Sequence, residues 1–178
     1  GDSAEDAEKK QEALNKEIEN GMWLVDEMQK SVNESIAATT NDTEIQLANM
    51  KLTGATRAEM FAVEQDQIRT NIRLQQGATE VAKREFDKVL KAKKATMEDQ
   101  MKAEEKYFAS IRKEREYEHQ LELNEINEKV KAAEEEAAKK KAAADKYAND
   151  RKNALDKIRT AEMNYQDSLL SDQQRELV

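Results

Sequence analysis

The sequence predicts an all-α protein, an elongated coiled coil or helical-hairpin bundle with very long helices. Proline is absent from all 178 residues and the 4 glycines stand at positions 1, 21, 54 and 77, so residues 78–178 contain nothing that ordinarily ends a helix. Charged residues make up 38% of the chain and aromatic residues only 4%, which is too few to fill a large core. Apolar residues nevertheless recur at spacings of three and four, a pattern typical of helices that pack along one narrow stripe.

Breaks in this pattern divide the chain into three helical segments. We expect an acidic N-terminal helix over 1–40, a second helix over 41–77 that runs antiparallel to the first, and a long C-terminal helical arm over 78–178. The break between the first two is predicted at residues 37–44, where large apolar residues disappear and Asn41 with Glu44 resembles a capping box. Gly54 and Gly77 offer further positions for a kink or a turn.

A heptad seam is the main candidate for packing against other helices. In the arm its two positions carry mostly alanine, and Lys140, Arg151 and Ser168 interrupt it. An uninterrupted helix from 79 to 170 would be about 140 Å long at about 1.5 Å per residue, too long for the core of one globular domain. Parallel and antiparallel pairing, and the number of chains, stay open. The larger seam residues are Leu14, Ile18, Val25, Met28 and Val32 in the first helix, and Leu123, Ile126, Val130, Tyr147, Ile158 and Tyr165 in the arm.

Two features lie outside the regular seam. Trp23 falls off it and is either an edge residue that caps the bundle or an anchor for a partner chain. Residues 112–119 are almost all charged, and one extra residue separates the apolar positions on either side. This segment is a solvated flank, a hinge or a turn.

The charge distribution restricts the partners. The formal net charge is −8, and residues 1–50 alone hold twelve acidic and four basic residues, while bases gather at 83–94. Either both faces are solvated, or the acidic helix lies against the basic patch. A short basic patch without interleaved aromatics argues against nucleic-acid binding. No apolar run approaches the roughly 18 residues that a membrane span requires.

No constellation of side chains indicates catalysis, so we expect no enzyme, no cofactor and no small-molecule substrate. His119 is the only histidine, cysteine is absent, and thin coiled coils offer no pocket that would shift the pKa of a carboxyl group. Acidic side chains of neighbouring chains could jointly collect Ca²⁺ at low affinity, as an alternative to a solvated face. The candidate ligands are Glu134, Glu135, Glu136, Asp145 and Asp150.

Local segments resemble a known family. Residues 56–61 (TRAEMF), and 115–119 (REYEH) followed by 124–126 (NEI), are similar to stretches ahead of the apolar repeat in ciliate trichocyst or mucocyst matrix proteins. The acidic composition without proline or cysteine resembles that family as well. The resemblance implies secretion as a precursor, proteolytic maturation, packing in the lumen of a secretory granule, and Ca²⁺-linked expansion on release.

The sequence therefore predicts a structural protein that packs with itself or with related coiled-coil chains into a crystalline or filamentous assembly, such as a secretory granule matrix. The alternative is a coiled-coil adaptor or a cytoskeletal or axonemal tether located in the cytoplasm.

Overall fold

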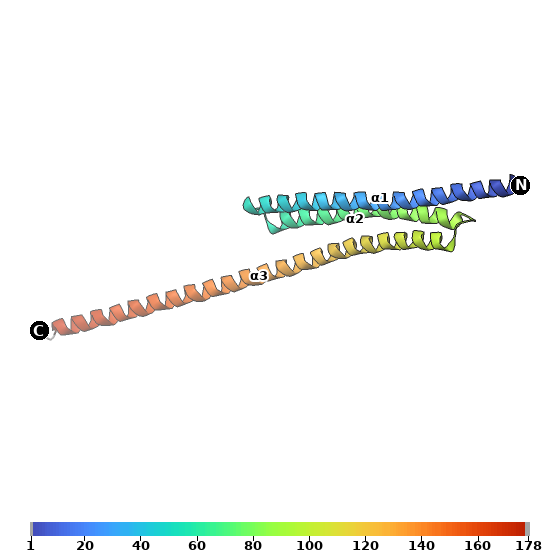
Figure 1. Ribbon diagram of the computed structural model, residues 1–178. Helices are drawn as coiled ribbons and strands as arrows, with labels where there is room; N and C mark the ends of the chain where they lie inside the picture. The colour runs from blue at the N-terminus through green and yellow to red at the C-terminus, as the bar shows by residue number, and fades with distance from the viewer. Residues whose placement is uncertain (1, 177–178) are drawn as a thin grey trace. The chain divides into compact units, whose positions relative to one another are not determined.

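The computed structural model describes residues 2–176, with side chains described over 3–171. It consists of three helices, α1 (Asp2–Leu52), α2 (Arg57–Lys91) and α3 (Met97–Glu176), and no strand occurs within residues 2–176 (Figure 1). The predicted all-α fold class is therefore confirmed. The chain divides into unit 1, Gly1–Asn127, and unit 2, Glu128–Val178.

Unit 1 is built on a helical hairpin. α1 and α2 lie side by side in opposite directions, and the first part of α3 returns along them (Figure 1). One buried cluster joins all three helices through Ile18, Val89 and Ala103. A second cluster contains Val32, Ile36 and Ala78, and Tyr117 of α3 packs against it. Unit 1 is thus a narrow bundle whose interior holds small groups of apolar side chains.

The turn of the hairpin lies at residues 53–56. Gly54 has a φ of 78°, a conformation that only glycine adopts readily. The amide of Ala55 donates to the carbonyl of Met50 at 2.9 Å and that of Gly54 to Lys51 at 3.4 Å, which is the Schellman pattern of a helix end. Thr56 then caps α2, because its hydroxyl oxygen accepts from the amide of Glu59 at 3.2 Å.

The break predicted at residues 37–44 is wrong, since α1 continues through this segment to Leu52. Its polar side chains are used within the hairpin instead. The Thr39 hydroxyl donates back to the carbonyl of Ser35 at 2.9 Å. Gln67 of α2 donates to the hydroxyls of Thr39 and Thr40, and Thr43 donates to Gln67. Polar packing between helices, rather than a loop, therefore explains the loss of apolar residues here.

Gly77 does not end a helix either, since α2 runs from Arg57 to Lys91. One helical glycine costs only about 1 kcal/mol, and the packing of Gln75 and Ala78 on either side outweighs that cost. Residues 112–119 are also helical, which rules out a turn in this segment. Lysine, arginine and glutamate are good helix formers, so a run of charges without an apolar stripe need not interrupt a helix.

The second turn, at residues 92–96, was not expected from the sequence. The amide of Ala92 closes α2 on the carbonyls of Lys88 and Val89. Thr96 and Asp99 then form a reciprocal capping box: Thr96 accepts from the amide of Asp99 at 3.1 Å, and Asp99 accepts from the amide of Thr96 at 3.2 Å. Because no glycine is needed for these contacts, the turn escapes a search for helix-breaking residues.

A polar layer crosses the middle of unit 1. Gln75 is fully buried at 0% exposure, and it is the largest such side chain within the described residues. Its amide exchanges two hydrogen bonds with Gln29 of α1, at 2.9 and 3.0 Å. It also donates to the carbonyl of Ser110 in α3 at 3.3 Å. This layer fixes the register of all three helices, because sliding any one of them would leave a buried amide unpaired.

Two glycines within helices give a matched test of how side chains pack between α1 and α2. A Cβ at Gly21 would meet the buried carboxylate of Glu85, with 3.1 Å to its Cδ, whereas a Cβ at Gly77 would lie 3.5 Å from Met28 Cε, an ordinary contact. Both alanine variants gain about 1 kcal/mol of helix propensity. We expect Gly77→Ala to raise the free energy of unfolding, and Gly21→Ala to raise it less, because the buried carboxylate of Glu85 has to move aside.

Denaturant unfolding measures both variants. Adding Glu85→Ala to Gly21→Ala removes the displaced side chain and should recover most of the difference. Equal stabilisation by the two glycine replacements would contradict the placement of the Glu85 side chain beside Gly21.

Candidate assembly surfaces

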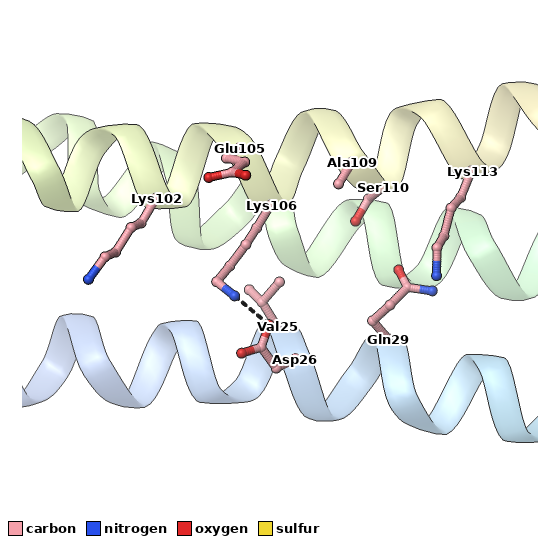
Figure 2. A pocket seen from close by; sticks show the side chains of 9 residues that line it. All are labelled: Val25, Asp26, Gln29, Lys102, Glu105, Lys106, Ala109, Ser110 and Lys113. Atoms are coloured by element: carbon pink, nitrogen blue, oxygen red, sulfur yellow. Dashed lines mark hydrogen bonds and ion pairs between the residues drawn. The ribbon is translucent and has the colours of Figure 1, made fainter.

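A groove runs between α1 and α3 in unit 1 (Figure 2). Its volume is about 470 Å³, and Asp26 lies in it against Lys106, with 2.6 Å between Oδ1 and Nζ. Lys113 donates to the side-chain oxygen of Asn33 at 3.4 Å. Both pairs join residues 80 positions apart, so α1 and α3 run parallel in a constant register. The groove is lined by Val25, Asp26, Gln29, Lys102, Glu105, Lys106, Ala109, Ser110 and Lys113.

The charged residues of this groove align α1 with α3 and do not form a binding site. Asp26 is largely exposed and Lys106 is half-buried, so solvent screens their ion pair and it contributes at most about 1 kcal/mol. Nearby, Gln29 and the carbonyl of Ser110 are already bound to Gln75. The hydrogen bonds of Gln75 to Gln29 and Ser110 were not predicted from the sequence. The available signal was the presence of Gln65 and Gln75 on the otherwise apolar face of the second helix.

The predicted seam residues of the first helix are covered by the chain itself. Ile18, Val25 and Val32 are buried, and Leu14 and Met28 pack against the two apolar clusters. Their partners are side chains of α2 and α3 rather than a second molecule.

The predicted seam residues of α3 lie in solvent. In unit 1, Leu123 and Ile126 are 44% and 55% exposed. In unit 2, every side chain from residue 129 to residue 171 is exposed, including Val130, Tyr147, Ile158 and Tyr165. Unit 2 is a helix on which a heptad pattern of apolar residues has no partner within the described residues. An amphipathic surface of this kind is typical of a helix that pairs with another helix.

The candidate calcium ligands do not form a site within one chain. Glu134, Glu135, Glu136, Asp145 and Asp150 all lie in unit 2, and Glu136 pairs with Lys140 at 3.4 Å. Among the described residues, no group of three or more acidic, histidine or cysteine side chains is placed to hold a metal ion. Because Ca²⁺ takes six to eight oxygen ligands, these residues would need carboxylates from a second chain.

Trp23 is 63% exposed on α1, next to Leu24 at 46%. Its neighbour Met22 packs against the cluster of Ile18, Val89 and Ala103. Most of Trp23 therefore lies in solvent.

The comparisons with known proteins add no further information about function. No protein-family model, curated protein or solved structure matches the chain. None of the helices, over the residues described, is long and apolar enough to cross a membrane.

Tyr117 reports on the packing of α3 against the hairpin. It contacts the cluster of Val32, Ile36 and Ala78, and burial, with a smaller effect of the Glu116 charge, raises its pKa above the ordinary value of 10.0. The folded state therefore holds this proton more tightly than the unfolded state. Its contribution to stability is complete below about pH 10 and is lost as the pH rises through the folded-state pKa.

We expect Tyr117→Phe to weaken the loss of unfolding free energy above about pH 10, measured by denaturant unfolding from pH 7 to 11. Tyr147→Phe, on a side chain that is 70% exposed, is the control and should leave the slope unchanged. The same slope in both variants would contradict the burial of Tyr117.

Proposed function

We propose that this protein is a structural protein that packs laterally through coiled-coil helices into an ordered assembly of its own or related chains. The observation that carries the proposal is the exposed heptad seam of unit 2. Unit 1 uses its apolar residues internally, whereas the apolar residues of unit 2 remain in water. Contact with further chains is the way in which such a helix gains stability.

The composition of the seam supports packing on several sides in addition to pairing with one neighbour. Buried leucine or isoleucine contributes about 1.5–3 kcal/mol, while an alanine contributes far less. Between Val130 and Ile158 most seam positions are alanine, and Tyr147 is the one large apolar residue on the regular seam. Small side chains let several helices approach closely. A lateral array buries the same alanine faces repeatedly.

The finer form of the proposal is a crystalline or filamentous matrix in the lumen of a secretory granule, responsive to Ca²⁺. The resemblance to ciliate trichocyst and mucocyst matrix proteins supports it, as does the acidic composition without proline or cysteine. Glu134, Glu135, Glu136, Asp145 and Asp150 are then cation ligands shared between neighbouring chains. Electron microscopy of the pure chain with and without Ca²⁺ tests this form, which requires ordered arrays that change with the ion.

The alternative is an adaptor or cytoskeletal tether that recognises one partner. The exposed pair of Trp23 and Leu24 on α1 favours it, because tryptophan is a frequent anchor in specific protein contacts. A Trp23→Ala change that abolishes binding to one partner, while the chain alone forms no arrays, would support the adaptor over the matrix.

The main prediction is that assembly stabilises the helix of unit 2. The melting temperature of unit 2, followed through its helical signal, should rise with protein concentration over a hundredfold range. Ile158→Asp should weaken assembly by about 100-fold or more, because each contact loses about 3 kcal/mol and gains a buried charge. Circular dichroism and light scattering measure the two effects.

Asn153→Asp is the matched control, since it adds the same charge on the same helix away from the seam. It should assemble nearly as well as the parent. A melting temperature of unit 2 that is independent of concentration, or equal effects of the two substitutions, would contradict the proposal.

A further inference from the structure

The charges that flank the seam of unit 2 are arranged for a particular partner. One seam position holds Val130, Ala137, Ala144, Ile158 and Tyr165. The residues immediately before this position flank the seam on one side, and they are 129, 136, 143, 150, 157 and 164. The residues four after it flank the seam on the other side, and they are 134, 141, 148, 155, 162 and 169. In a parallel coiled coil, each residue of the first set faces the residue five positions later in the second chain.

Every charged contact of this kind is attractive when the second chain is a copy in the same register. Lys129 faces Glu134, Glu136 faces Lys141, and Lys157 faces Glu162. Each occurs twice because the pair is symmetric. The remaining contacts bring no two like charges together: Ala143 with Ala148, Asp150 with Leu155, and Asn164 with Leu169.

We infer that unit 2 pairs with unit 2 of a second copy as a parallel, in-register coiled coil over residues 129–168. The inference rests on the proposed function, because it names the first pairing step of the assembly. The exposed side chains of Leu155 and Leu169, at 46% and 45%, flank the seam and extend the apolar contact toward its C-terminal end.

Antiparallel pairing of the same stretch fits the charges less well. An alignment centred near residue 143 brings Lys129 against Lys157 and Glu136 against Asp150. A shorter, staggered alignment pairs Lys129 with Asp150 and Glu134 with Lys141, but it leaves Ile158 and Tyr165 outside the matched stretch. The parallel pair covers the whole seam of unit 2 without a repulsive flank.

Lys140 and Arg151 interrupt the seam, and each would face its own copy. Their long stems can pack while the charged ends reach water, and Lys140 already lies 3.4 Å from Glu136 of its own helix. A polar residue at a seam position lowers stability but fixes register and favours two chains. Both layers bring two like charges together in the parallel pair, which lowers its stability.

Single cysteines test the geometry directly, since the chain has none of its own. In the parallel pair, Ala133→Cys and Ala161→Cys each face themselves within disulfide reach. Under a glutathione redox buffer, both should give at least about tenfold more disulfide-linked dimer than Asn153→Cys, which lies on the outer face. A mixture of Ala133→Cys and Ala144→Cys should give no mixed dimer, because these positions meet only in the staggered antiparallel alignment.

A charge exchange provides a second measurement. Lys157→Glu should raise the dissociation constant about tenfold, and adding Glu162→Lys should restore it to within about twofold, because residues five apart do not face each other in a single helix. Lys152→Glu carries the same charge change on the outer face and should have little effect.

Mixed dimers of the Ala133→Cys and Ala144→Cys variants, or no excess of self-linked dimer over the Asn153→Cys control, would overturn the inference. Either result combined with ordered arrays in electron micrographs would leave the proposed function standing. Self-linked dimers without any larger array would support the parallel pair and contradict the proposed assembly.

Discussion

The structure depends on one constraint: the chain has too few large apolar side chains to build a thick core. In unit 1 the interior is completed by amides, and the mutual hydrogen bonds of Gln29 and Gln75, with the bond from Gln75 to the Ser110 carbonyl, hold three helices in one register. Gln65 is also buried, and its amide has no hydrogen-bond partner among the described residues, which costs about 1–3 kcal/mol. Register is thus specified by polar contacts, while the apolar contribution to stability stays small.

The same constraint explains why apolar residues remain exposed in unit 2. The heptad positions of α1 find partners on α2 and α3, but those between residues 129 and 171 find none among the described residues. A helix with an alanine-rich stripe and complementary flanking charges is poorly stabilised alone and well suited to neighbours. Unit 1 packs within one chain, and unit 2 carries the surface that we propose for packing between chains.

The sequence predicted the all-α class well, because it follows from the spacing of apolar residues and the absence of proline. Ile18, Val25 and Val32 are buried as their periodicity requires. It predicted turns poorly, because a turn depends on partners that spacing does not show. The polar run at residues 37–44 stays helical because Gln67 lies opposite, and the true turn at 92–96 is made by the Thr96–Asp99 capping box without a glycine. The turns also decide whether a seam packs within its own chain or faces another chain, so spacing alone does not predict this.

Amide hydrogen exchange at two protein concentrations, about 100-fold apart, tests the central claim most directly. Amides of unit 1 should exchange at the same rate at both concentrations, because their packing lies within one chain. Amides between residues 129 and 168 should exchange rapidly in dilute solution and become strongly protected at the higher concentration. Protection of unit 2 that is equal at both concentrations would show that its helix is stabilised within one chain, and it would contradict the account.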